Sequence, residues 1–228
     1  MPPRWVVKLG GSLGDWDRLP EWLETLAESG VVLVPGGGPF ADQVRSAQAR
    51  WGFGDRTAHA MAILAMRQYG LMLAALCPGF ATATHIGELA AVFAGSRSAI
   101  WLPDPEAIPA REVPASWEIT SDSLAAWLAR NLGANHLLLV KSAAIPPGEL
   151  TIARLVEEAW VDAAFPALIA GAKFTAWVCR REDHARSRGG LRDPNSIFTR
   201  VIPDTGQRSV SHEITPHVYQ SPLFRQPA

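Results

Sequence analysis

The sequence predicts an α/β fold built on a mainly parallel sheet. Residues 5–9 and 31–34 are short apolar runs rich in β-branched side chains and bounded by glycine, a pattern typical of buried strands. Between them, residues 22–29 place apolar side chains on one face of a helix that Gly30 would end. A strand, a helix and a second strand within roughly 30 residues form a βαβ unit, whose strands run parallel.

Further helices and strands alternate along the chain. Residues 56–76 predict a long helix that is apolar nearly all round and therefore packs inside the protein. The other predicted helices are 40–51, 121–131 and, for the most part, 155–170, and the other predicted strands are 99–102, 136–140 and 174–179. From residue 180 onward Arg, Ser, Pro, Gly and Asp dominate. We therefore expect a domain over residues 1–179 and a weakly structured tail or peripheral hairpin over 180–228.

Size and charge favour a soluble globular protein. The 228 residues can bury a full core, and 48% of them are hydrophobic against 19% charged. A formal net charge of -1 gives no electrostatic basis for binding nucleic acid or an anionic membrane. The N-terminus does not resemble a signal peptide, and the most apolar stretch, 60–75, is too short to span a bilayer. We expect a cytoplasmic protein.

A lysine and a glycine turn end the first predicted strand. Gly10, Gly11 and Ser12 follow Lys8 closely, and the backbone N–H groups of such a turn can approach an anion because no Cβ lies in the way. The lysine adds a charge that can reach a phosphate. The alternative is a tight turn beside a solvated lysine, but a lysine in an apolar strand is costly without a partner. The pattern favours a phosphate site.

Three consecutive glycines, Gly36, Gly37 and Gly38, follow the second predicted strand. Three glycines in a row cost backbone entropy on folding, so their presence needs a reason. Close approach of an anion to their amides, at the start of the next helix, would supply one. The alternative is a merely flexible loop. Together with the first turn, the three glycines suggest a site for two phosphate-like groups, which is the layout of a kinase.

Polar side chains gather again at Thr120, Ser121, Asp122 and Ser123, just before an apolar helix. Ser and Asp are ordinary helix N-cap residues, but a cap explains only one of the four. Ligands of open α/β sheets bind at the carboxyl ends of the strands, where Asp122 could hold a lysine in position or bind magnesium. Lys141 directly follows a predicted strand and is either a second lysine of this site or a loop lysine.

These stretches resemble the amino acid kinase family, which includes acetylglutamate, aspartate, carbamate, uridylate and isopentenyl phosphate kinases. The resemblance rests on residues 7–12, 34–38, 120–126 and 137–142, and it covers roughly residues 4–179. It implies a three-layer αβα sandwich in which ATP and the acceptor lie end to end over the carboxyl edge of the sheet. It also implies a homo-oligomer, a dimer or higher, that uses ATP with Mg²⁺.

The resemblance further implies roles for individual residues. Lys8 would stabilise the transferring phosphoryl group and Asp122 would organise the lysines, with Asp122 also the one candidate for a magnesium ligand. The residues implied for the nucleotide and its phosphates are Gly10, Gly11, Ser12, Ser121 and Lys141, and those implied for the acceptor are Gly36, Gly37, Gly38, Asp55, His59 and Thr120. For His59 the alternative is a core histidine whose hydrogen bonds are satisfied.

Within the family, residues 35–43 followed by Asp55, residues 59–62 and residues 65–66, together with Trp117, are similar to the kinases of methanofuran synthesis. Those enzymes phosphorylate an aminomethylfuran methyl phosphate to its diphosphate, so the leading expectation is an ATP-dependent phosphotransferase with a small phosphorylated acceptor. The alternatives are a kinase of the uridylate, acetylglutamate or isopentenyl phosphate type, or a non-catalytic nucleotide-binding or storage subunit.

Two features depart from the family pattern. The Asp-Gly that commonly follows the nucleotide strand is replaced by residues 142–147, and the late segment that supplies a second catalytic lysine is missing. Lys141 would then substitute for that lysine, or magnesium would supply the second positive charge, or activity would be impaired.

Overall fold

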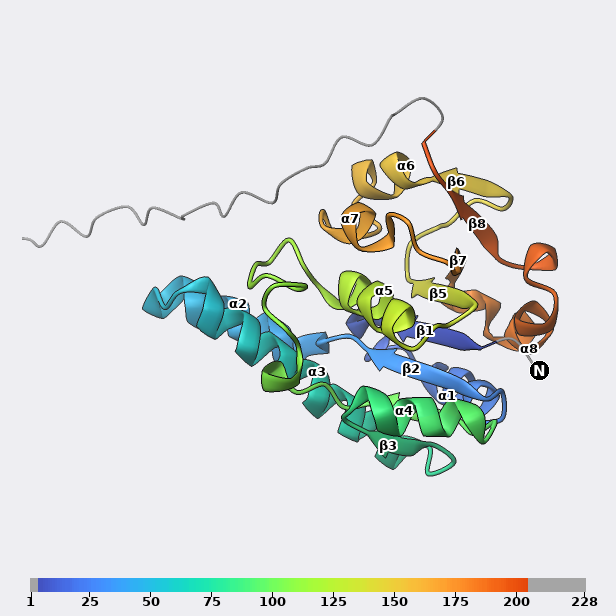
Figure 1. Cartoon of the computed structure of the whole chain (residues 1–228), viewed down its shortest axis with the longest axis horizontal. Coiled ribbons are helices and arrows are strands. Elements are labelled where there is room, and N and C mark those ends of the chain that lie inside the picture. Colours follow the sequence, from blue (N-terminus) through green and yellow to red (C-terminus); the bar gives the residue numbers. More distant parts are fainter. Residues whose placement is uncertain (1–3, 205–228) are drawn as a thin grey trace, which may run out of the picture.

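The computed structural model describes residues 4–204, which form a three-layer αβα sandwich (Figure 1). The sheet has eight strands, in the spatial order β3 (Ala81–Ala83), β4 (Ala99–Trp101), β2 (Val31–Pro35), β1 (Trp5–Leu9), β5 (His136–Lys141), β7 (Thr175–Arg180), β8 (Thr199–Ile202) and β6 (Glu149–Thr151). Only β7 and β8 pair antiparallel, and every other neighbouring pair is parallel. The predicted α/β class and its mainly parallel sheet are confirmed.

Helices cover both faces of the sheet. The first face is covered by α4 (Ile86–Ala94), α5 (Ser121–Asn131), α6 (Ile152–Glu157) and α7 (Phe165–Ile169), and the second by α1 (Leu19–Ala27), most of α3 (Asp55–Leu76) and α8 (His184–Arg192). Helix α2 (Gly38–Trp51) packs along α3 and extends past the sheet (Figure 1). Because side chains alternate along a strand, Val6 of β1 faces the first layer and Val7 faces the second.

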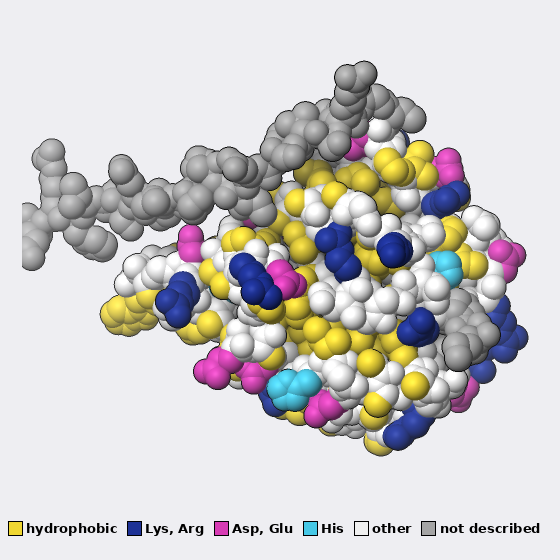
Figure 2. Space-filling model, viewed as in Figure 1, with side chains coloured by type: hydrophobic (Ala, Val, Ile, Leu, Met, Phe, Trp, Pro, Cys, Tyr) yellow, Lys and Arg dark blue, Asp and Glu magenta, His cyan; other side chains and the backbone are white. Residues whose placement is uncertain are grey.

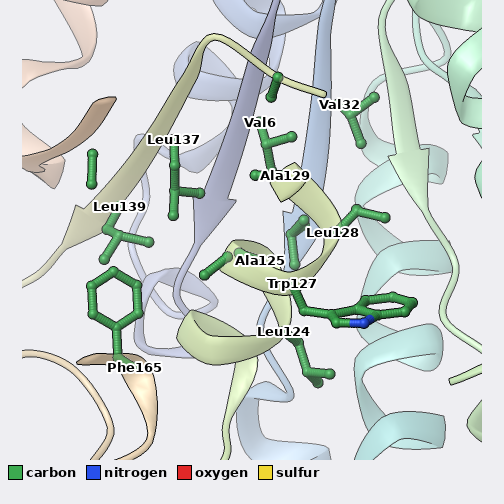
Figure 3. Packing of buried hydrophobic residues seen from close by; sticks show 14 of the residues in the cluster. Val6, Val32, Leu124, Ala125, Trp127, Leu128, Ala129, Leu137, Leu139 and Phe165 are labelled. Atoms are coloured by element: carbon green, nitrogen blue, oxygen red, sulfur yellow. The ribbon is translucent and has the colours of Figure 1, made fainter. Parts of the chain in front are cut away.

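Helix α5 lies over the centre of the sheet and is almost entirely buried. Every residue from Ser121 to Ala129 is buried. Its apolar side chains, among them Leu124 and Leu128, pack with Val6 of β1 and Leu137 of β5 (Figure 3). This packing fixes the start of α5 above the carboxyl ends of β1 and β5.

The helix predicted over residues 155–170 is instead two short helices, α6 and α7, joined by a loop. Ala159 has a φ of 51°, a left-handed conformation that ends α6. Pro166 then lies in the first turn of α7, where its missing N–H costs nothing. The loop between these helices reaches the first turn of α5 through Asp162.

Residues 180–204 are not a weakly structured tail. Helix α8 packs against α1, and β8 pairs with both β7 and β6, so the sheet continues well beyond residue 179. The core contacts come from scattered residues such as Leu191, Phe198 and Val201, which is why the composition gave little sign of them. Strand β3 and helix α4 also form in a stretch for which the sequence analysis assigned no element. The rest of the expected tail, 205–228, lies outside the described residues.

The described surface mixes both signs of charge. On the face shown in Figure 2, Lys and Arg side chains are interspersed with Asp and Glu side chains, and apolar surface lies between them. Among residues 4–204, no helix combines the length and the apolar character that crossing a membrane requires.

Replacing Gly190 by alanine is expected to lower the free energy of unfolding by about 1–3 kcal/mol, the usual cost of overfilling a core. The new Cβ would lie 2.4 Å from Cζ of Phe198, whose ring is buried. Gly189→Ala is the matched control, because its Cβ would meet Ile197 at an ordinary 3.5 Å. Chemical denaturation measures both variants. Equal stabilities would contradict the packing of α8 against the segment that leads into β8.

Candidate active site

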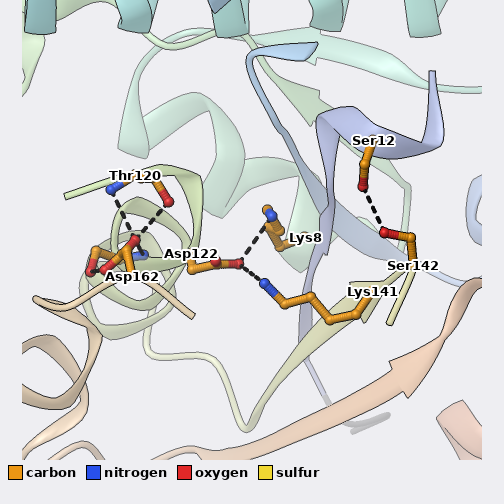
Figure 4. A network of polar contacts seen from close by, with 8 residues as sticks. Lys8, Ser12, Thr120, Asp122, Lys141, Ser142 and Asp162 are labelled. Atoms are coloured by element: carbon orange, nitrogen blue, oxygen red, sulfur yellow. Dashed lines mark hydrogen bonds and ion pairs between the residues drawn. The ribbon is translucent and has the colours of Figure 1, made fainter. Parts of the chain in front are cut away.

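The polar stretches singled out in the sequence meet at the carboxyl edge of the sheet (Figure 4). Strand alternation puts Lys8 on the same face of β1 as Val6, and Lys141 on the same face of β5 as Leu139, which is the face that α5 covers. Both lysines therefore point toward the first turn of α5, where Asp122 lies.

Asp122 is shared by the two lysines. The Nζ atom of Lys141 donates a hydrogen bond of 2.7 Å to Oδ1 of Asp122, and Nζ of Lys8 lies 3.0 Å from the same oxygen. The three side chains are at most 11% exposed. The expected pairing of Lys8 with Asp122 is present, and Lys141 stands beside it as a second lysine.

Burial and charge act in opposition on this cluster. Burial alone would raise the pKa of Asp122, but the charges of Lys141 and Lys8 outweigh it and hold that pKa below its usual value. Burial lowers the pKa of Lys141 to about 8, and the nearby charge of Lys8 lowers it too, against the opposing effect of Asp122. Asp122 is therefore ionised at neutral pH, whereas Lys141 titrates in the physiological range.

Asp162 is a site residue that the sequence analysis missed. Its Oδ2 accepts hydrogen bonds from the backbone N of Thr120 at 2.9 Å, from Oγ1 of Thr120 at 2.7 Å and from the backbone N of Ser123 at 3.1 Å. Its Oδ1 accepts one from the Ser123 hydroxyl. Asp162 thus accepts from two backbone N–H groups at the start of α5, those of Thr120 and Ser123, from outside the helix. The signal that could have identified Asp162 is Pro166, which favours the first turn of a new helix. A helix that starts there leaves Asp162 in the preceding loop, where it is a candidate site residue.

The two glycine turns pack backbone to backbone. A Cβ on Gly11 would lie 2.2 Å from the N atom of Gly38, and a Cβ on Gly36 would lie 2.4 Å from the N atom of Gly11. The N–H of Gly36 also donates to the carbonyl of Leu9 at 2.8 Å. Glycine is therefore needed at these positions for the turns to meet, whether or not an anion binds there.

Two adjoining cavities open at this edge. The lysine cavity, of about 340 Å³, surrounds Lys8, Asp122 and Lys141. The α2–α3 cavity, of about 380 Å³, lies between these two helices and the start of α5. Gly11, Ser12 and Thr120 line both cavities, so the cavities meet at these three residues.

The outer wall of the α2–α3 cavity joins α2 to the loop before α5. The guanidinium of Arg45 lies 4.2 Å from the ring centre of Trp117, and the indole N–H of Trp117 donates to Oε1 of Gln48 at 2.6 Å. His59 lines the same cavity. Burial lowers the pKa of His59, and its Nε2 has no hydrogen-bond partner within residues 4–204. His59 therefore contributes a neutral imidazole to the wall, and its Nε2 is buried and unpaired among the described residues.

The structure brings together most of the site residues named from the sequence. Gly10 and Lys141 line the lysine cavity, whereas Gly37, Gly38, His59 and Ser121 line the α2–α3 cavity. Ser121 thus lies on the cavity expected for the acceptor rather than on the one expected for the nucleotide. Ser12, shared by both cavities, contacts Ser142 through their hydroxyls at 3.1 Å.

Two of the expected acceptor residues do not line either cavity. Gly36 is used in the contact between the glycine turns. Asp55 accepts a hydrogen bond of 2.9 Å from Nε2 of Gln48 and so ties the start of α3 to α2. Both residues contact the segments that line the cavities but do not line the cavities themselves.

Known proteins share this architecture. The chain is 27% identical over 214 residues to the kinase of 5-(aminomethyl)furan-3-yl-methyl phosphate from Methanocaldococcus jannaschii, a match that spans 86% of this chain and 97% of that protein. The uridylate kinase of Archaeoglobus fulgidus superposes with a TM-score of 0.67 at 18% identity, over 87% of this chain and 99% of that one. The UMP kinase of Ureaplasma parvum superposes with a TM-score of 0.65 at 15% identity, over 88% of this chain and 99% of that one. A sequence model described as the amino acid kinase family matches residues 3–144. This chain therefore belongs to the amino acid kinase family.

Proposed function

We propose that the protein is an ATP-dependent phosphotransferase that phosphorylates a small acceptor which already carries a phosphate. The observation that carries the proposal is the pair of lysines on Asp122, placed beside the boundary between two cavities. Phosphoryl transfer asks little covalent chemistry of a protein and depends on positioning and on stabilising charge. Two ammonium groups beside that boundary meet this need.

ATP would occupy the lysine cavity, with its terminal phosphate toward Gly11, Ser12 and Thr120. Gly10 lies beside the reacting region, because a Cβ there would be 3.5 Å from Nζ of Lys8. Lys8 and Lys141 would then stabilise the negative charge of the group in transfer, and Asp122 would keep both ammonium groups in place without contacting the substrate.

The acceptor that the relatives and the cavity lining favour most is an aminomethylfuran methyl phosphate. The relative from Methanocaldococcus jannaschii acts on this compound by name, and it matches almost its whole length to this chain. In the α2–α3 cavity, Gly11, Ser12 and Thr120 would receive the phosphate, and the apolar stretch that includes Ile63 and Met66 suits a flat ring. The likeness to UMP kinases, at 18% identity or less, supports the fold alone.

Magnesium would arrive with ATP rather than on a site built by the protein. Within residues 4–204 no group of three or more His, Cys, Asp or Glu side chains is placed to hold a metal ion. Asp122, the one candidate from the sequence, already faces two ammonium groups, whose charges repel a divalent cation. Mg²⁺ commonly binds through substrate phosphates and water, so ATP itself would supply its ligands.

A non-catalytic nucleotide-binding subunit is the competing reading. Its main support in the sequence was the missing second lysine, and Lys141 now lies in contact with Asp122. Incubation of the protein with Mg-ATP and the furan phosphate, with release of ADP followed over time, separates the two. ADP release that depends on the acceptor supports the kinase, whereas nucleotide binding without ADP release from any acceptor supports the binder.

We also propose that α3 mediates a homo-oligomer. Leu64 and Leu71 lie two turns apart on its outer face and are 45% and 52% exposed. Gln68 and Ala75 continue this exposed stripe at helical spacing. An apolar stripe of this kind on a helix favours pairing with the same stripe of a second copy.

Lys8→Ala is expected to lower kcat by about 100-fold or more, the effect of losing one electrostatic stabiliser of a transition state. Asp122 would keep its hydrogen bond to Lys141, so the fold should persist, and circular dichroism checks this. Lys173→Ala, at an exposed lysine, is the control and should retain full activity. Coupled detection of ADP measures both variants. A Lys8→Ala enzyme with an unchanged rate would refute the assignment of this site.

The pH profile of kcat/KM should fall as pH rises through about 8, the pKa of Lys141, because the neutral amine no longer stabilises phosphate charge. Lys141→Arg should remove this fall, since a guanidinium stays protonated. Lys173→Arg, an exposed lysine changed in the same way, should keep it. A fall at the same pH in Lys141→Arg would assign it to another group.

Introducing charge on the α3 stripe, with Leu64→Glu and Leu71→Glu combined, should convert the oligomer into monomers. Two carboxylates at the centre of an apolar interface lose hydration without gaining a partner. Light scattering after size-exclusion chromatography gives the mass. Ala90→Glu, an exposed position on α4, is the control. An unchanged mass for the α3 variant would place the interface elsewhere.

A further inference from the structure

The walls of the α2–α3 cavity carry more negative than positive charge. Asp15, Asp42 and Arg45 are its charged side chains, and the partly buried His59 of the same wall is held toward the neutral form. Two carboxylates against one guanidinium leave a net negative wall. A cavity that takes a phosphate monoester would be expected to carry the opposite balance, because the charges of wall and ligand would otherwise repel.

A second charge on the acceptor resolves this conflict. If the end of the acceptor distant from its phosphate carries an ammonium group, the carboxylates attract that end while Gly11, Ser12 and Thr120 receive the phosphate. The apolar residues Ile63 and Met66 lie in the same wall and suit the ring between the two charged ends.

Of the two carboxylates, Asp15 is the one without an internal partner. Asp42 lies 3.6 Å from the guanidinium of Arg45, one turn along α2, so its charge is partly balanced. Within residues 4–204, no Lys, Arg or His nitrogen lies within ion-pair distance of Asp15. Asp15 follows the short turn Gly11–Leu13, so its carboxylate lies on the same cavity wall as Gly11 and Ser12, where it is exposed to solvent.

Near Asp15, which is exposed to solvent, lies the buried side chain of Tyr69. The hydroxyl of Tyr69 packs against Gly14, since a Cβ on Gly14 would lie 3.3 Å from it, and this hydroxyl has no hydrogen-bond partner within the described residues. Burial, with a further contribution from the Asp15 carboxylate, raises the pKa of Tyr69 to about 12. Asp15 thus adds negative charge to the cavity wall at a place where residues 4–204 supply no ion-pair partner.

We propose that Asp15 is a specificity-determining residue which binds the protonated primary amine of the acceptor and so selects aminomethyl over neutral acceptors. This inference rests on the proposed function. Asp15 takes no part in the transfer itself, so it acts on binding of the acceptor rather than on the chemical step.

The test compares two acceptors that differ in charge alone: 5-(aminomethyl)furan-3-yl-methyl phosphate and the matching 5-(hydroxymethyl) compound. Asp15→Asn should lower kcat/KM for the amine by about 10-fold or more, mainly through KM, the size expected for a hydrogen bond to a charged group. For the alcohol kcat/KM should stay within about 2-fold, because an amide oxygen still accepts a hydrogen bond from a neutral hydroxyl, whereas it no longer pairs with a positive charge. Asp17→Asn, an exposed aspartate outside the cavity lining, is the matched control and should leave both values unchanged.

The outcomes separate this inference from the proposed function. Turnover of the amine by the unchanged enzyme supports the function, and loss of the preference for amine in Asp15→Asn alone supports the inference. An equal loss on both acceptors would assign Asp15 a structural role and overturn the inference. So would an Asp15→Asn enzyme that keeps its preference. An unchanged enzyme that does not phosphorylate the amine removes the proposed function, and the inference with it.

Discussion

The buried carboxylate of Asp122 is the interaction on which the rest of the site depends. An isolated buried charge costs several kcal/mol, and here three charges lie together, at most 11% exposed. Such a cluster is tolerable only if its members hold fixed distances. The protein achieves this with regular structure alone: Lys8 on β1, Lys141 on β5 and Asp122 in the first turn of α5, a helix that is buried as far as Ala129. The net charge of the cluster, one carboxylate against two ammonium groups, leaves a positive charge to be neutralised by a phosphate.

A second carboxylate, Asp162, controls the place of the first. It binds the backbone at Thr120 and Ser123, on either side of Asp122, and it comes from a loop that the α6–α7 break creates. The same hydrogen bonds orient the hydroxyl of Thr120, which lies where the two cavities meet. The start of α5 is therefore held by tertiary contacts rather than by a cap within its own sequence, which explains why four polar residues gather there.

The parts of this architecture that are local in sequence could be predicted, and those that depend on distant contacts could not. The apolar run at 5–9 and the glycines after it are local signals, and they gave β1, Lys8 and the phosphate turn. The partnership of Lys141 with Asp122 arises because β5 lies beside β1 in the sheet, an order that no single segment encodes. Strand β8 has only four residues and is stabilised by pairing on both sides, so its sequence carried no sufficient signal. The role of Asp55 stays a prediction, because its contact with Gln48 of α2 depends on how two helices pack and not on a local pattern.

The contact between the two glycine turns has a consequence for how members of this architecture can diverge. Gly11, Gly36 and Gly38 meet without any side chain between them, so the separation of the two glycine turns is set by peptide backbone and cannot be tuned by substitution. The reacting centre is thereby insulated from most mutations. The walls contributed by α2, α3 and the loop before α5 are made of side chains and carry no such constraint. Substitutions in those walls can therefore change the acceptor preference while the geometry of transfer stays the same. The α2–α3 cavity is thus the part of this protein where a change of substrate would arise first.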